Sequence, residues 1–170
     1  MMPKHDPVVV KVMGLSATQG SVTPFPYLKG DGSLGVAVPQ NPKVLKWRKA
    51  VAAAVKEKMP SIEYGQYEQV SVDLVFCFER PKSNKRKFFT VKKADLDKLQ
   101  RSILDALSGI AYEDDCQVTE IHASKVYASE NCVFIRIRNH MIPYSDLLSD
   151  ISSGKIDAQG TVFVGGELLC

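Results

Sequence analysis

The sequence predicts an α+β domain with a small mixed or mostly antiparallel sheet and two main helices. Four segments have the pattern of strands, and two longer segments place apolar residues at helical spacing. Their order is strand, loop, helix, strand, helix, strand, strand. The chain has 170 residues, of which 45% are hydrophobic and 24% charged, so it can form one domain with a sizeable core. These proportions argue against a disordered chain and against a two-domain enzyme.

The first part of the chain holds one strand and a long loop. Apolar residues alternate over residues 8–12, and Gly14 ends the run. Residues 16–40 are rich in glycine and proline, which predicts a loop with one short strand at 36–38. Long loops in compact domains are often functional.

The first helix begins at Asn41. This residue and Pro42 suit an N-cap and a first helical position, and apolar residues then recur at helical spacing until Pro60. Trp47 follows that spacing, so we expect it in the core. The other face of the helix carries four lysines, which either touch a polyanion or form a solvated face: Lys43, Lys46, Lys49 and Lys56.

The second part of the chain holds one helix and three strands. Strict alternation predicts a half-buried strand over residues 70–78, and a second helix follows over residues 96–109. After a polar turn, two strands are predicted at 117–127 and 132–138. The last strand places its valine and isoleucines on one face and its two arginines on the other.

The final residues are predicted to form an extension to the main domain. The main domain covers residues 1–140, and residues 141–170 follow as an extension of unknown role. A short helix is predicted at 145–151 and a short strand at 161–164. Thirty residues are too few for an independent core, so the extension either packs on the main domain or serves as a partner-binding tail.

The cysteines and histidines do not suggest a zinc site. Cys77, Cys116, Cys132 and Cys170 form no Cys-x-x-Cys pair, and the three histidines lie far apart in the sequence. No apolar run approaches the length needed to span a membrane. We therefore expect a cytoplasmic protein with reduced thiols and no membrane partner.

The net charge of +3 hides an uneven distribution. Residues 80–101, here called the basic segment, contain two acids and nine cations: Arg80, Lys82, Lys85, Arg86, Lys87, Lys92, Lys93, Lys98 and Arg101. Such a segment can hold phosphates. Within it, Phe88 and Phe89 either stack on nucleic-acid bases or pack against the domain or a dimer partner.

The two acids of the basic segment are two positions apart, which on a helix would point them to opposite sides. They converge if Asp95 is the N-cap and Asp97 lies in the first turn. Arg101 and Asp105 then follow on the same polar face. Taken separately, Asp95 could simply cap the helix, and Asp97 could simply complement the helix dipole or pair with Arg101.

A second acidic cluster follows the second helix. Residues 113–115 are Glu-Asp-Asp, and they could return to the first cluster if the chain doubles back. Clustered carboxylates repel one another unless a cation lies among them, and all-oxygen ligands favour Mg²⁺. A metal held beside lysines and arginines suits phosphodiester hydrolysis, with Arg101 stabilising the transition state.

Three linked motifs occur in this region: Lys93-Ala94-Asp95-Leu96-Asp97-Lys98-Leu99-Gln100, Leu104-Asp105-Ala106-Leu107 and Asp114-Asp115-Cys116-Gln117-Val118. In these motifs and their spacing, the sequence resembles RusA-type Holliday junction resolvases. The resemblance covers about residues 7–138 and is strongest over 80–127.

The resemblance implies that Asp95, Asp97 and Asp115 bind Mg²⁺, or alternatively Mn²⁺, and that Asp114 is a less critical neighbour. Arg101 stands where the family has a catalytic lysine. The implied protein is a homodimer that binds branched DNA and resolves four-way junctions by paired symmetric nicks, in recombination and repair. A bacterial or phage-encoded, nucleoid-associated enzyme is expected.

Two other functions remain open from the sequence. In a non-catalytic DNA-binding module, the cations would supply the affinity and the acids would only cap a helix. In a structure-selective nuclease of another kind, the substrate would be a flap or a replication fork.

Overall fold

The computed structural model describes residues 6–20, 23–38, 41–83, 94–142, 145–157, 163–164 and 167–168. Its elements in chain order are β1 (Val8–Met13), β2 (Phe25–Leu28), β3 (Leu34–Ala37), α1 (Pro42–Lys58), β4 (Val70–Glu79), α2 (Leu96–Leu107), the 3₁₀ turn η1 (Asp115–Gln117), β5 (Val118–Ala128), β6 (Cys132–Asn139), α3 (Leu147–Ser152), β7 (Phe163–Val164) and β8 (Glu167–Leu168). The α+β prediction is confirmed. No helix in the described part of the chain is long and apolar enough to cross a membrane.

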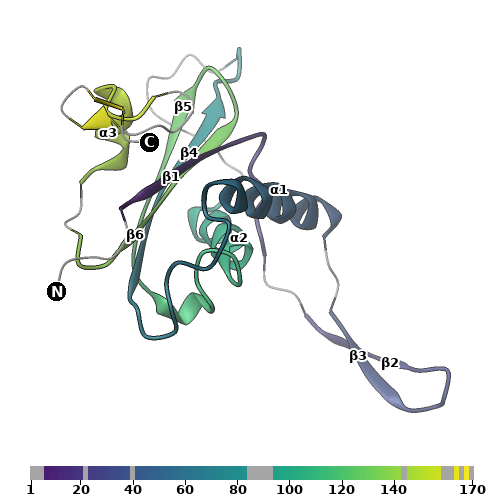
Figure 1. The fold of residues 1–170 in the computed structure, drawn as a ribbon. Coiled ribbons are helices and arrows are strands. Elements are labelled where there is room, and N and C mark those ends of the chain that lie inside the picture. Colours follow the sequence, from purple (N-terminus) through teal and green to yellow (C-terminus); the bar gives the residue numbers. More distant parts are fainter. Residues whose placement is uncertain are drawn as a thin grey trace.

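The main sheet is mixed and has the strand order β1-β6-β4-β5. The first three strands pair antiparallel, whereas β4 and β5 are parallel neighbours joined through α2. Because a crossover helix runs back along the sheet, α2 begins beside the end of β4 and ends beside the start of β5. Figure 1 shows α1 and α2 on one face of the sheet and α3 on the other.

The main core lies between the sheet and the two long helices. Both helices place their apolar residues on it, as their spacing predicts, with Val51 and Val55 from α1 and Leu99 and Ile103 from α2 fully buried. Trp47 belongs to the same cluster, so its predicted place in the core is confirmed. Asn41 caps α1, accepting a hydrogen bond from the backbone N–H of Lys43 at 3.0 Å.

The expectation of a half-buried strand over residues 70–78 is wrong, because both faces of β4 are covered. Val70 to Phe78 are all buried. The second face packs against a smaller cluster that includes Val75, Phe134, Leu147 and Ile156. The extension therefore supplies two members of this cluster, and its described residues 145–157 pack on the sheet.

Ion pairs fill the polar part of this second face. Arg136 and Arg138 both donate to the same oxygen of buried Asp73, at 2.7 and 3.2 Å. Arg136 also donates to Asp150 in α3 at 2.8 Å, and Arg138 to Glu120 in β5 at 2.6 Å. The two arginines predicted to face away from the apolar residues of β6 are therefore buried, and they join the extension to the sheet.

We expect Glu120 to make stability depend on pH in acid. Hydrogen bonds from His122, Ser71 and Arg138 lower the pKa of this carboxyl group from 4.5 to about 2. A depressed folded-state pKa stabilises the protein fully above about pH 4.5, and this contribution is lost as the pH falls towards 2. Urea unfolding at several pH values should therefore show a smaller loss between pH 4.5 and 2 in Glu120→Gln. Equal pH slopes in both proteins would contradict this expectation.

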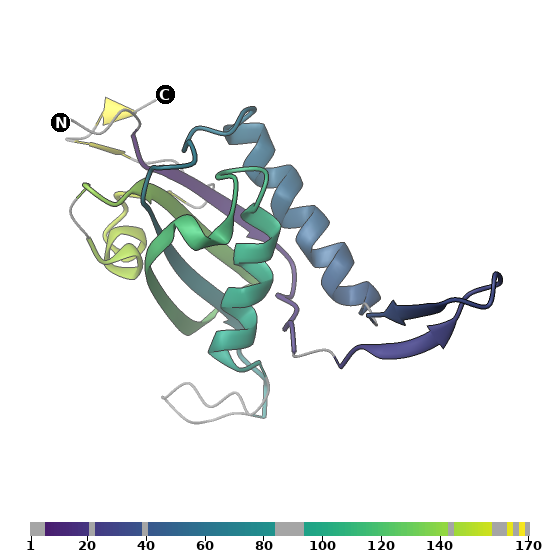
Figure 2. The ribbon, with the colours of Figure 1, turned by 90° about the horizontal axis from the view of Figure 1, so that it is seen from below.

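The segment predicted as a loop contains a β-hairpin. β2 and β3 pair antiparallel, with Phe25 opposite Ala37 and Leu28 opposite Leu34. The prediction of one short strand at 36–38 captured only the end of β3. Figures 1 and 2 show this hairpin projecting from the body of the protein, beyond the start of α1.

Candidate active site

The start of α2 brings a carboxylate and two cations together. Asp95 is the N-cap residue, as predicted, but its side chain makes no capping hydrogen bond. Instead its carboxylate accepts a hydrogen bond from the ammonium group of Lys98, one turn further along the helix. This bond and the nearby charge of Lys125 hold the pKa of Asp95 below its usual value, and the same pair raises the pKa of Lys98. Asp95 is therefore ionised at neutral pH.

The backbone immediately before Asp95 is held in an unusual conformation. Ala94 has a φ of 75°, in the left-handed region that side chains other than glycine rarely occupy. The ammonium group of Lys125 donates a hydrogen bond to the carbonyl of Ala94 at 2.9 Å. Lys125 lies towards the end of β5, so the sheet fixes the position at which α2 begins.

The sequence reasoning did not assign Lys125 to the site. The available signal was topological: in a parallel β-α-β unit, the end of the second strand lies near the start of the crossover helix. Recognising that β4 and β5 are parallel would have placed Lys125 beside Asp95.

Asp97 and Arg101 occupy the exposed side of α2. Asp97 lies in the first turn, as predicted, and its charge contributes to the raised pKa of Lys98. Among the described residues, no ion pair joins Asp97 to Arg101. Both side chains are exposed, so they are open to a ligand at the surface.

The acidic turn after α2 has a clear division of roles. Asp114 caps η1, accepting a hydrogen bond from the backbone N–H of Cys116 at 2.9 Å, which lowers the pKa of its carboxyl group. The buried side chain of Gln117 accepts from the backbone N–H of Glu113 at 2.9 Å and donates to the carbonyl of Gly65 at 2.7 Å. Asp115 is exposed. Asp114 and Gln117 thus build the turn, which leaves Asp115 available for a ligand.

The structure does not bring Asp95, Asp97 and Asp115 together within one chain. α2 has twelve residues and is therefore about 18 Å long at 1.5 Å per residue, with Asp95 and Asp97 at its start and Asp115 in the turn that follows its end. Asp115 and Asp105 instead each lie near Tyr112 at the far end of α2, where burial and then the charges of these carboxylates raise the pKa of Tyr112. Figure 2 shows η1 and the start of α2 at opposite ends of that helix. Among the described residues, no group of three or more potential ligands could hold a metal ion.

The middle motif has a structural role. Asp105 pairs with Arg48 of α1 at 3.5 Å, and Arg48 also donates to the carbonyl of Asp105 at 2.9 Å. The side-chain amide of Gln19 donates to the Asp105 carboxylate, while the backbone N–H of Gln19 donates to the carbonyl of Lys98 at 3.0 Å. These contacts fasten the segment after β1 and the first helix to α2.

The structure describes residues 80–83 and 94–101 of the basic segment. Arg80 lies over the ring of Tyr127, 4.9 Å from its centroid, and Lys82 is exposed close by. Lys98 and Arg101 lie on α2. The remaining predicted DNA-binding residues fall outside the described residues: Lys85, Arg86, Lys87, Phe88, Phe89, Lys92 and Lys93.

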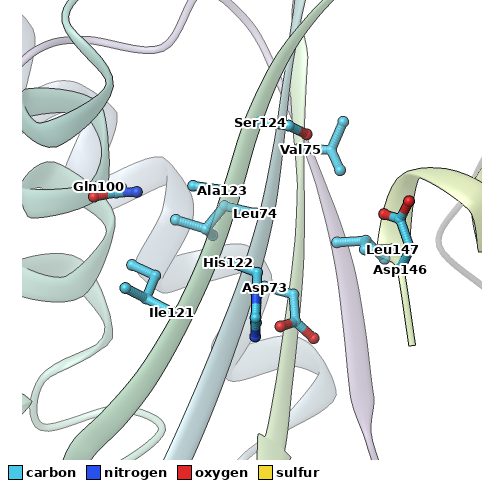
Figure 3. A pocket seen from close by; sticks show the side chains of 10 residues that line it. All are labelled: Asp73, Leu74, Val75, Gln100, Ile121, His122, Ala123, Ser124, Asp146 and Leu147. Atoms are coloured by element: carbon cyan, nitrogen blue, oxygen red, sulfur yellow. The ribbon is translucent and has the colours of Figure 1, made fainter. Parts of the chain in front are cut away.

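A hollow of about 360 Å³ lies across the edge strand β5. Figure 3 shows Gln100 of α2 on one side of it, with Asp146 and Leu147 on the other. Asp73 and His122 line it between these elements. None of the predicted catalytic residues lines this hollow. The hollow is therefore distinct from the candidate active site.

Comparison with known proteins agrees with the motifs. The family model for the endodeoxyribonuclease RusA matches residues 26–138, about two thirds of the chain. No curated protein matches the sequence. The match spans β2 to β6 and includes Asp95, Asp97, Arg101 and Asp115. The chain therefore belongs to the RusA endodeoxyribonuclease family.

Proposed function

We propose that this protein is a Mg²⁺-dependent endonuclease that resolves four-way DNA junctions by paired symmetric nicks, in DNA recombination and repair. The observation that carries the proposal is the start of α2, where exposed, ionised Asp95 lies beside Asp97, Lys98 and Lys125. Carboxylates suit a hard divalent ion, and the surrounding cations suit the phosphates of a DNA strand.

One chain does not fit a three-carboxylate metal site, because the length of α2 lies between Asp95 and Asp115. Two chains related by a twofold axis can fit it, if each contributes Asp95 and Asp97 to one site and Asp115 to the other. We therefore propose a homodimer with two shared sites. Twofold symmetry also suits the nicking of two strands of a four-way junction.

The roles of the residues follow from their charges. Bound Mg²⁺ would lower the pKa of a water molecule and offset the charge that develops on phosphorus. Arg101 would bind the phosphate and stabilise this charge, because a guanidinium stays protonated near neutral pH. Lys98 and Lys125 hold Asp95 in its ionised form, which is the form that binds a metal ion.

The proposal is tested by incubating the protein with a synthetic mobile four-way junction, a flap, a fork and a plain duplex. We expect Mg²⁺ to produce paired nicks in the junction, at a rate at least ten times that for the other substrates. Preferred cleavage of the flap or fork would replace the junction with another branched substrate. Salt-sensitive binding without cleavage in either Mg²⁺ or Mn²⁺ would identify a DNA-binding module instead.

A further inference from the structure

The β2–β3 hairpin carries an unusual amount of exposed apolar surface. Six of its large apolar side chains are each between 45% and 75% exposed: Phe25, Tyr27, Leu28, Leu34, Val36 and Val38. β2 and β3 pack on each other, and neither makes extensive contact with another described element. Figures 1 and 2 both show the hairpin extending away from the sheet and the long helices.

The strand register sorts these side chains onto two faces. Directly opposed residues share a face, so Pro26, Val36, Leu28 and Leu34 form one aliphatic face. On the other face, Tyr27 lies opposite Gly35, and a Cβ atom at Gly35 would lie 2.7 Å from the tyrosine ring. The ring therefore packs directly on the glycine backbone. The aliphatic face has no such cover within the hairpin.

A hairpin of this kind needs a partner. A two-stranded hairpin is at best marginally stable alone in water, and contiguous exposed apolar patches mark interaction sites. DNA is a poor candidate, because the charged side chains of residues 23–38 are Lys29 and Asp31, whose charges cancel. The chemistry of the patch suits another apolar protein surface.

A second copy of the chain meets this need. The six exposed side chains offer several hundred square ångströms of apolar surface, on the scale of the roughly 800 Å² that each partner contributes to a standard interface. An aliphatic face is self-complementary, as a twofold contact between identical chains requires. In addition, Asp115 lies apart from Asp95 and Asp97 in one chain, so the candidate active site is incomplete without a partner.

We infer that the β2–β3 hairpin is the arm through which two copies of this chain associate, an inference that rests on the homodimer of the proposed function and names its interface. The aliphatic face of each hairpin is buried against the partner chain. Leu28 and Leu34 are the principal anchors, since they are the most exposed large aliphatic side chains of the hairpin.

The test compares two double variants by light scattering and analytical ultracentrifugation over a dilution series. Wild type is expected at twice the chain mass of 18.8 kDa. Leu28→Asp with Leu34→Asp should weaken dimerisation by at least about 100-fold, because buried anchors dominate interface affinity. The control is Tyr67→Asp with Met141→Asp, which places the same charges at exposed apolar residues outside the hairpin and should remain dimeric.

Circular dichroism and thermal unfolding verify that the hairpin variant stays folded, as expected for an element with little contact to the core. A monomeric wild type, a dimeric hairpin variant or a monomeric control would each overturn the inference. Cleavage is measured separately. If the protein forms a dimer that depends on the hairpin but does not cut junctions, the proposed function is contradicted and this inference stands. If the hairpin variant remains an active dimer, this inference is contradicted and the proposed function stands.

Discussion

Asp95→Asn and Asp115→Asn are each expected to slow junction cleavage by at least about 100-fold, the scale seen when one charge-stabilising group is removed from an active site. An amide keeps the size of the side chain but loses the negative charge that a divalent ion requires. Junction binding should persist or tighten, because the basic segment is unchanged. Single-turnover cleavage and gel-shift binding measure the two effects separately.

Asp114→Asn is the matched control, since it changes the residue next to Asp115. An asparagine oxygen can still accept the hydrogen bond from Cys116 that caps η1. Its cleavage rate should stay within about tenfold of wild type, well short of the loss expected at a charge-stabilising group. Full activity in either Asp95→Asn or Asp115→Asn would contradict the metal assignment.

A mixture of the two inactive variants tests whether the sites are shared. In a heterodimer of Asp95→Asn and Asp115→Asn, shared sites place both substitutions in one site and leave the other intact. Nicking activity should therefore return when the proteins are unfolded together and refolded, with single nicks exceeding paired ones. If each chain held its own site, both sites would carry one substitution and the mixture would stay inactive.

The second large effect is expected at Asp73, whose replacement should lower the free energy of unfolding. Its side chain is buried and accepts hydrogen bonds from Arg136 and Arg138 at 2.7 and 3.2 Å. Asp73→Ala would leave two buried guanidinium groups without their shared counter-charge. Breaking a buried ion pair in this way costs about 3–5 kcal/mol of unfolding free energy. Urea unfolding near neutral pH measures the loss.

Glu130→Ala is the control for this measurement. Glu130 pairs with Lys11 at 2.6 Å, but its side chain is half exposed, so its removal should cost less than about 1 kcal/mol. Equal losses in Asp73→Ala and Glu130→Ala would show that the buried network is not a major source of stability.

Local features of the fold could be predicted because they depend on neighbouring residues. The cap at Asn41, the apolar faces of α1 and α2, and Asp95 at the start of α2 all follow from spacing within a few residues. The hairpin could not be predicted in the same way. Its glycines and prolines are typical of loops, and its exposed apolar residues form strands by pairing across a turn.

The buried face of β4 also depended on distant residues. Alternation correctly placed one set of side chains on the helical face, but the sequence did not show what would cover the other. Leu147 and Ile156 of the extension cover this face. The ion pair between Arg136 and Asp150 offsets the cost of burying charged groups there.

The amino-acid sequence shows which charged groups are available: carboxylates at the start of one helix, further acids after it, and a run of cations in the same segment. The three-dimensional fold determines which of these groups lie close enough to act together. The parallel pairing of β4 and β5 places Lys125 beside Asp95 and holds Asp115 at the other end of α2. Spacing along a chain limits how far apart two residues can be, whereas the direction of the connecting helix determines whether they meet.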